Sequence, residues 1–430
     1  MKALHYGKRG WLLIVISAFT MFYATIGGVA LNVIVPKFSE LYGWSSTQLL
    51  AYATPIGFIT AFSCLVFSYF TTKPKGGMRI TTVSMLIFIV GISLWGFSTA
   101  PWQYFVCFTL VNVGGTGAAF YGLVILLGNW FPVKKGAVIG IVTAGANVGT
   151  MLIGWVFTWL WDTVGFRMSF VVLALTIAVP FILLLLFIRE TPEQIGCYPD
   201  NDPSASLSAL SAQKERNAII DKTSPFTVRR LLHTKEFWTL FLSLSILKMM
   251  NQGVNSSVVP ATVSFGNNWT WAMSTMTVFS IVAVPSSVVA GFIDTKIGVR
   301  KTSILVSLVG TVAMFASIFH GHTWSRILIA STYGFFLGSA SNLTTSLLVT
   351  YFGRYDFKKA LAVMEPAITL LRMLGVSLVA HTLETTGHYE TSLAVFGVLS
   401  LAAAVMFLCT KEKHLGRTDE DIEKLLQSAD

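Results

Sequence analysis

Residues 167–188, "RMSFVVLALTIAVPFILLLLFI", form an apolar run that is long enough to cross a lipid bilayer as a helix. The hydrocarbon core of a bilayer is about 30 Å thick, and about 20 helical residues span it. The apolar residues of this run are continuous rather than alternating, which favours a helix over a strand of a β-barrel. The run therefore predicts a transmembrane helix.

Similar runs recur along almost the whole chain, which is 54% hydrophobic and only 12% charged. A soluble protein carries about 25% charged residues. The sequence therefore predicts an all-α membrane protein with twelve transmembrane helices, over residues 11–35, 47–70, 79–99, 102–129, 137–160, 167–188, 237–262, 271–293, 302–320, 326–350, 360–383 and 390–410.

The distribution of Lys and Arg predicts the orientation of these helices. Of the 30 Lys and Arg residues, 25 lie in the amino terminus, the even-numbered loops and the tail, whereas the odd-numbered loops hold Lys37, Arg167 and Arg326. By the positive-inside rule, both termini are cytoplasmic. We expect a multi-pass protein of the cell inner (plasma) membrane. The chain has no basic soluble domain, so a nucleic-acid partner is excluded.

The only long polar stretch, residues 189–236, separates six predicted spans from six. We predict an N-terminal bundle over 1–188, a cytoplasmic linker over 189–236, and a C-terminal bundle with its tail over 237–430. The halves repeat weakly: "NWFPVKKGAVIG" (129–140) matches "TYFGRYDFKKALAV" (350–363) at an offset of 224 residues. Two related six-helix bundles are typical of secondary transporters.

Here the chain resembles the major facilitator superfamily. The resemblance rests on "GFIDTKIGVRK" (291–301), between the eighth and ninth spans. Within that superfamily, "GWSSTQL" (43–49), "GNWFPVKKGAVIGIVTAGANVG" (128–149) and "TPEQIGCYPDN" (191–201) are similar to the oxalate/formate antiporter and monocarboxylate carrier branch. The resemblance implies transport by alternating access, with Asp294, Arg300 and Lys301 forming a cytoplasmic gate lock.

Two cations interrupt the apolar runs, Lys248 in the seventh span and Arg372 in the eleventh. A cation in the middle of a bilayer costs about 2.5–3.5 kcal/mol, so it faces a bundle interior or a water-filled cavity. At about 1.5 Å per residue, each lies roughly 17–18 Å from the predicted cytoplasmic end of its helix. We therefore predict that both line a substrate site near the midplane.

Polar residues around Lys248 extend this predicted site. Ser245, Asn251, Gln252 and Asn255 share one face of the helix with Lys248 by their spacing. On the repeat alignment, Tyr23 takes the place of Lys248 in the first half and is a candidate for the opposite wall. The remaining substrate-binding candidates are Asn112, Tyr121 and Asn147.

Glu365 is the only intramembrane acid that could balance these cations, and it lies seven residues before Arg372. It is predicted either to lock helices together near the gate or to carry a proton; Lys248 itself could be a structural partner of a carboxylate. Two cations with at most one acid leave a positive charge, which an anion would neutralise. Arg offers a fork that fits a carboxylate.

The resemblance also implies carboxylate substrates. In oxalate antiporters a pair of basic residues, one in the eighth span and one in the eleventh, binds the dianion. Arg372 matches the latter; the eighth span has no cation, and Lys248 is a substitute from the seventh. The predicted function is therefore transport of an organic anion, as an exchanger or a proton symporter.

Several alternatives remain open at this point. The substrate could be a larger amphipathic carboxylate such as a bile acid, or the chain could export hydrophobic compounds. A non-transporting receptor would not need the gate motif, and no cluster of His, Asp or Cys indicates an enzyme. We expect a monomer in the lipid bilayer, with no cofactor or metal, and with protons or a counter-anion as possible coupling partners.

Overall fold

The computed structural model describes residues 6–71, 75–132, 134–202, 219–220, 223–319, 323–410, 415–417 and 419–427. Within these ranges the secondary structure is helical, without strands, which confirms the predicted all-α class. Parts of the predicted linker (203–218, 221 and 222) lie outside the described residues.

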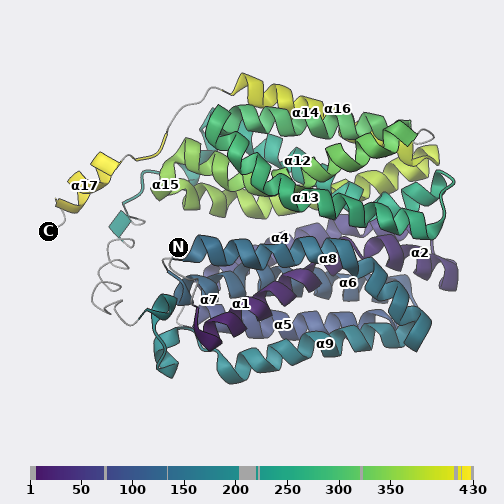
Figure 1. Ribbon diagram of the computed structural model, residues 1–430, viewed down its shortest axis with the longest axis horizontal. Helices are drawn as coiled ribbons and strands as arrows, with labels where there is room; N and C mark the ends of the chain where they lie inside the picture. The colour runs from purple at the N-terminus through teal and green to yellow at the C-terminus, as the bar shows by residue number, and fades with distance from the viewer. Residues whose placement is uncertain are drawn as a thin grey trace. The chain divides into compact units, whose positions relative to one another are not determined.

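The helices follow the predicted spans in order (Figure 1). The first six spans are formed by α1 (Gly7–Ala24) with η1 (Thr25–Gly27) and α2 (Leu31–Tyr42), α3 (Ser46–Ala51) with α4 (Ala53–Thr71), α5 (Gly76–Trp95), α6 (Pro101–Thr116) with η2 (Gly117–Gly122) and α7 (Leu123–Trp130), α8 (Lys135–Val164), and α9 (Phe166–Phe187). After the short turns η3 (Pro192–Ile195) and η4 (Pro199–Asn201) come α11 (Val228–Leu232), α12 (Lys235–Ser264), α13 (Trp269–Ile297), α14 (Val299–Ile318), α15 (Thr323–Thr386), α16 (Tyr389–Cys409) and α17 (Asp419–Gln427).

Among the described residues, ten helical segments are long and apolar enough to cross a membrane. The helix α12 is not one of them, although it has 30 residues. Its middle, "KMMNQGVNSS" (248–257), is rich in polar side chains, which lowers its mean hydropathy. Because α12 takes the place of the seventh predicted transmembrane span, its polar side chains require another helix or water beside them.

The sequence predicts one continuous helix over residues 11–35. The structure instead shows a first span that is broken. The chain leaves the α-helix at Thr25, passes through a 3-10 turn, and starts α2 at Leu31. Apolar periodicity does not reveal this break, because every residue around it except Thr25 is apolar or glycine. Gly27 and Gly28 lower the cost of leaving the helix, since glycine has low helix propensity.

The tenth and eleventh spans form one long helical run, α15, that bends sharply at Gly353. This residue has a φ of 74°, a conformation that favours glycine. The two predicted spans, 326–350 and 360–383, lie on either side of this bend. Gly353 therefore takes the place of an ordinary loop.

The chain divides into two compact units whose boundaries fall inside helices. The first unit comprises 1–204, 252–280 and 373–389, and the second comprises 205–251, 281–372 and 390–430. The first unit thus holds α1 to α9 together with the last part of α12, the first part of α13 and the end of α15, from residue 373 onward. The predicted division into bundles over 1–188 and 237–430 stays a prediction.

In the first unit, α1 packs closely along α8 (Figure 1). A Cβ atom on Gly145 of α8 would lie only 2.2 Å from the backbone oxygen of Ala18 in α1. Only glycine allows this approach, and small residues at helix contacts are typical of membrane bundles.

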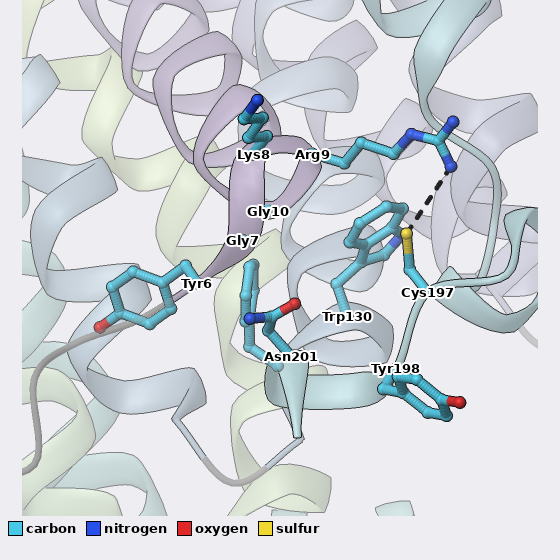
Figure 2. A pocket seen from close by; sticks show the side chains of 10 residues that line it. Tyr6, Gly7, Lys8, Arg9, Gly10, Trp130, Cys197, Tyr198 and Asn201 are labelled. Carbon is cyan, nitrogen blue, oxygen red and sulfur yellow. Dashed lines mark hydrogen bonds between the residues drawn. The ribbon is translucent and has the colours of Figure 1, made fainter. Parts of the chain in front are cut away.

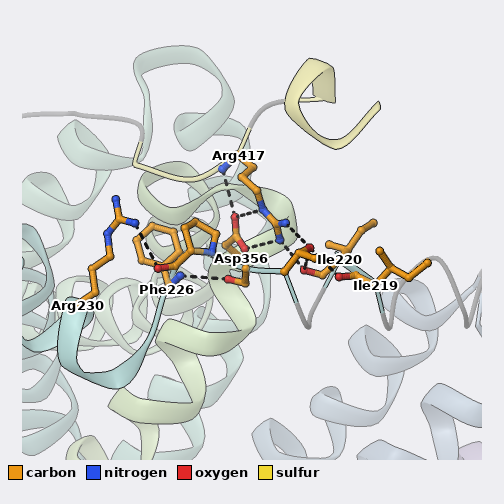
Figure 3. Close-up of polar contacts among 9 residues, drawn as sticks. Ile219, Ile220, Phe226, Arg230, Asp356 and Arg417 are labelled. Atoms are coloured by element: carbon orange, nitrogen blue, oxygen red, sulfur yellow. Dashed lines mark hydrogen bonds and ion pairs between the residues drawn. The ribbon is translucent and has the colours of Figure 1, made fainter. Parts of the chain in front are cut away.

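In the second unit, one arginine of the tail contacts α15 and the linker (Figure 3). Arg417 binds Asp356 with two nitrogens, Nε at 3.0 Å and a terminal nitrogen at 2.8 Å. It also donates to the backbone oxygen of Ile220 and to the hydroxyl of Thr223. The side chain of Asp356 is fully buried and that of Arg417 is 11% exposed. We call this set of residues the tail clamp.

Candidate functional site

The second unit holds the predicted substrate-binding residues Lys248 on α12 and Arg372 on α15, together with the predicted gating residue Glu365 on α15. Lys248 is within electrostatic range of the other two, since the Glu365 carboxylate attracts its ammonium group and the Arg372 guanidinium repels it. Lys248 and Arg372 are half-buried, whereas Glu365 is exposed. Two cations and one carboxylate therefore lie on α12 and α15 of this unit, with formal charges that sum to +1.

Ser245 lies one helical turn before Lys248 on the same face. Its side chain is 2% exposed, yet its hydroxyl has no hydrogen-bond partner among the residues that the structure describes. A buried serine in a helix normally donates to the carbonyl four residues earlier, as Ser243 does to Thr239 on α12. Ser245 therefore holds an unused hydroxyl beside the predicted site.

A second group of predicted residues lies in the first unit, around the break in the first span. A Cβ atom on Gly28 would lie 2.7 Å from the side-chain nitrogen of Gln252, and one on Gly27 would lie 3.0 Å from the side-chain oxygen of Asn112. Gln252 from α12 and Asn112 from α6 thus flank the same turn of backbone. The two glycines leave room for both amides.

Asn255 takes part in a contact that the sequence did not reveal. The side-chain nitrogen of Asn32 donates to the backbone oxygen of Asn255, at 2.5 Å. The side-chain oxygen of Asn32 accepts from the backbone N–H of Val259, at 3.0 Å. Asn32 is 1% exposed and stands in the predicted apolar run 11–35. A single amide side chain in an apolar run is the sequence signal that could have indicated this contact between Asn32 and α12.

The other substrate-binding candidates occupy different surroundings. The hydroxyl of Tyr23 donates to Thr176 at 2.9 Å, and its ring packs in the core of the first unit. Tyr121 lies in the π-helical turn η2, where its ring contacts Phe67. Asn147 on α8 and Asn251 on α12 are half-buried. Substrate contact by these four residues stays a prediction.

The predicted gate residues lie at the junction of α13 and α14. Arg300 donates to the backbone oxygens of Phe407 and Leu408, the last turn of α16. A cation at a helix carboxyl end satisfies free carbonyls and the helix dipole. Asp294 is half-buried and Lys301 exposed, and in the described part of the chain no ion pair joins Asp294 to either cation. Their gating role stays a prediction.

The start of α1 lines a separate cavity of about 170 Å³ (Figure 2). Figure 2 shows Arg9 reaching towards Cys197; this side chain also donates to the backbone oxygen of Ile195, at 2.8 Å. None of the predicted substrate-binding residues lines this cavity. That Lys248 and Arg372 bind the substrate stays a prediction. Among the described residues, no three His, Cys, Asp or Glu side chains are grouped to hold a metal.

Comparison with known proteins points to a family of transporters. The family model described as "Major Facilitator Superfamily" matches residues 78–275 and 241–428. Among curated proteins, the glucose-6-phosphate exchanger SLC37A2 of Xenopus tropicalis is 28% identical over 40% of this chain and 34% of its own. Monocarboxylate transporter 9 of Mus musculus is 26% identical over 34% of this chain and 28% of its own.

The solved structures agree on the fold. A crystal structure of a D-xylose–proton symporter superposes with a TM-score of 0.73, at 14% identity, over 95% of this chain and 99% of that one. At this identity the likeness concerns the fold alone. It confirms the arrangement predicted from the apolar runs.

Proposed function

The chain belongs to the Major Facilitator Superfamily, and on this premise we propose that it carries an organic anion, a carboxylate, across the membrane by alternating access. Membership makes the protein a multi-pass membrane transporter rather than an enzyme, as the sequence predicted. That the substrate is an anion is our proposal, and it is based on the charged residues of α12 and α15.

The observation that carries this proposal is the group Lys248, Glu365 and Arg372. With Glu365 ionised, the three side chains have one net positive charge, which is costly in a low-dielectric site until an anion neutralises it. A monocarboxylate would restore neutrality, with Arg372 able to bind both of its oxygens. Ser245 would donate its unused hydroxyl to the same anion.

The names of the relatives support an anionic substrate. Monocarboxylates and glucose 6-phosphate both carry negative charge, although one is a carboxylate and the other a phosphate ester. Each match covers about a third or less of the relative's own length. We favour the carboxylate because a single net positive charge fits a monoanion better than a phosphate ester, which carries nearly two negative charges.

The same charge balance suggests how transport is coupled. The conformational change that moves access from one side of the membrane to the other is slower when the site has a net charge than when it is neutral. The carrier with a bound anion therefore reorients faster than the empty carrier. This favours exchange of anions. Proton symport would instead use Glu365, which could take up a proton when a dianion binds.

The test uses purified protein in proteoliposomes with labelled monocarboxylates. We expect uptake that unlabelled carboxylates inhibit and that organic cations and neutral sugars do not. Inhibition by cations alone would contradict the anion site. Stronger inhibition by bile acids than by short carboxylates would favour the larger amphipathic substrates, and inhibition by neutral hydrophobic compounds would favour export of such compounds.

We further propose that the protein is a monomer of the cell inner (plasma) membrane with both termini in the cytoplasm. The excess of Lys and Arg in alternating loops supports this orientation. Labelling of cysteines placed in the tail and in the first loop, in intact cells, would test it.

A further inference from the structure

The contact between Asn32 and α12 goes beyond the substrate site. In a regular α-helix the N–H of residue 259 donates to the backbone oxygen of residue 255. Here both of these groups also bind one side chain, the Asn32 amide of α2. A third bond, from the Asn32 side-chain nitrogen to the backbone oxygen of Val29 at 2.9 Å, fixes the amide on its own helix. We call these three bonds the Asn32 clamp.

The part of α12 that the clamp grips is weakened by its sequence. Pro260 follows directly and lacks an N–H, so the carbonyl of Ser256 has no helical partner. The hydroxyls of Ser256 and Ser257 both donate to the backbone oxygen of Gly253. Serines bonded back to the helix backbone tend to bend it. Residues 253–260 are thus the deformable part of α12.

The clamp can be released at low cost. If α2 moved away, the N–H of Val259 and the oxygen of Asn255 would still have each other as partners in the ordinary helical bond. The Asn32 amide would meet water in the opening that forms. Both arrangements leave the backbone groups paired, as a reversible contact requires.

We infer that Asn32 is a positioning residue for transport: its amide holds α2 against residues 255–259 of α12 in the closed state of this end of the protein, and it releases them in each cycle. Asn32 acts through α12, because Gln252 and Lys248 lie one and two helical turns before Asn255. The inference rests on the alternating-access function but not on the identity of the substrate.

Cysteine labelling of purified protein in detergent tests the clamp without any substrate. The reporter is Val259→Cys, since Val259 is fully buried and keeps its backbone N–H in the variant. The background replaces Cys197 and Cys409, the two cysteines that are not buried, by serine. In this background we expect slow reaction with a maleimide.

Asn32→Ala should then speed labelling roughly tenfold, which corresponds to the loss of about 1.4 kcal/mol from the hydrogen bonds that favour the closed state. Asn32→Leu, which keeps the number and branching of the side-chain heavy atoms, should act in the same direction and covers the case in which the alanine variant does not fold. Asn267→Ala is the matched control. It removes an amide bond to Thr262 near the end of the same helix without touching α2.

Transport provides the second readout. With the clamp lost, the maximal rate of uptake should fall while the KM changes little, because Asn32 does not touch the substrate. Labelling of both Asn32 variants within about twofold of the parent would overturn the inference, since one hydrogen bond alone is worth more than that. An equal rise in Asn267→Ala would also overturn it. Neither result would bear on whether the substrate is a carboxylate.

Discussion

At the scale of single residues, the site depends on charges that lipid would not tolerate alone. Lys248 and Arg372 repel each other, and Glu365 offsets part of that repulsion. Each cation is stabilised in the membrane only when an opposite charge, from Glu365 or from a bound anion, is nearby. Removal of one cation should therefore affect substrate binding more than folding, since it reduces the repulsion in the empty protein.

We predict that Lys248→Ala and Arg372→Ala each weaken substrate binding at least about tenfold, the effect of losing about 1.4 kcal/mol from a charge-assisted hydrogen bond. Binding to purified protein, measured calorimetrically, checks this. Lys235→Ala is the control, because Lys235 is an exposed cation at the start of the same helix. Unchanged binding in both site variants would contradict the proposed site.

Ser245 gives a smaller and separate prediction. Ser245→Ala should weaken binding only a few-fold, roughly the value of one neutral hydrogen bond. It should also leave thermal stability unchanged or slightly higher, because the hydroxyl that it removes is buried without a partner. Ser243→Ala, which removes a hydroxyl already bonded to the helix, is the control. Loss of stability without loss of binding would show that Ser245 has a packing role.

At the scale of elements, the two halves fix their corresponding loops with opposite charge arrangements. In the first half, Asp200 after α9 accepts a hydrogen bond from the backbone N–H of Lys134, at 2.9 Å. In the second, Arg417 after α16 binds Asp356, which follows the bend of α15 at Gly353. A segment that follows the last span of each half therefore holds the loop between its fourth and fifth spans.

The charge of Asp356 makes the tail clamp sensitive to acid. Burial alone would raise the pKa of this carboxyl, but hydrogen bonds from Arg417 and Ser224 outweigh burial and hold it below its usual 3.8. A carboxyl with a lowered pKa stabilises the folded state above its unfolded pKa, and this contribution is lost as the pH falls through the folded value. The clamp should thus be intact from pH 5 to 8, roughly a unit above the usual value.

We predict that Arg417→Ala lowers the unfolding free energy of the protein by about 3 kcal/mol, because it leaves the buried carboxylate of Asp356 unpaired. Thermal unfolding of purified protein, followed at several pH values, checks this. The difference from the parent should stay constant between pH 5 and 8 and shrink below the usual pKa of 3.8. Lys37→Ala, which breaks the exposed pair with Glu40, should have little effect. A difference that varies between pH 5 and 8 would contradict the assignment to Asp356.

At the scale of the whole molecule, function depends on charge balance during reorientation. The empty site has one net positive charge if Glu365 is ionised, and a bound monoanion neutralises it. An uncompensated charge crosses a low-dielectric barrier slowly. The loaded protein should therefore change state faster than the empty one.

We predict that internal carboxylate accelerates uptake into proteoliposomes at least about tenfold, and that a pH gradient alone accelerates it less, because neutralising a site charge lowers a barrier worth several kcal/mol. Glu365→Gln, which removes a negative charge and so raises the net charge of the empty site, should slow net uptake more than exchange. Accumulation driven by the pH gradient without stimulation by internal substrate would instead establish proton symport through Glu365.

The sequence by itself determined the fold class, the family and the two intramembrane cations. These follow from local properties: the length of apolar runs, the spacing of motif residues, and the cost of a charge in lipid. It also placed Glu365 with Arg372, because residues seven apart share one face of a helix. It did not reveal the break in the first span, since glycine is common in continuous membrane helices as well.

Only the tertiary structure decided which polar groups have partners. It paired Tyr23 with Thr176 and Arg300 with the end of α16, and it joined Asn32 to residues 255–259, more than 220 positions away. It also brought Arg417 to Asp356 and to the end of the linker. Hydrogen bonds between residues far apart in the chain depend on how helices pack, and no periodicity in the sequence records that packing.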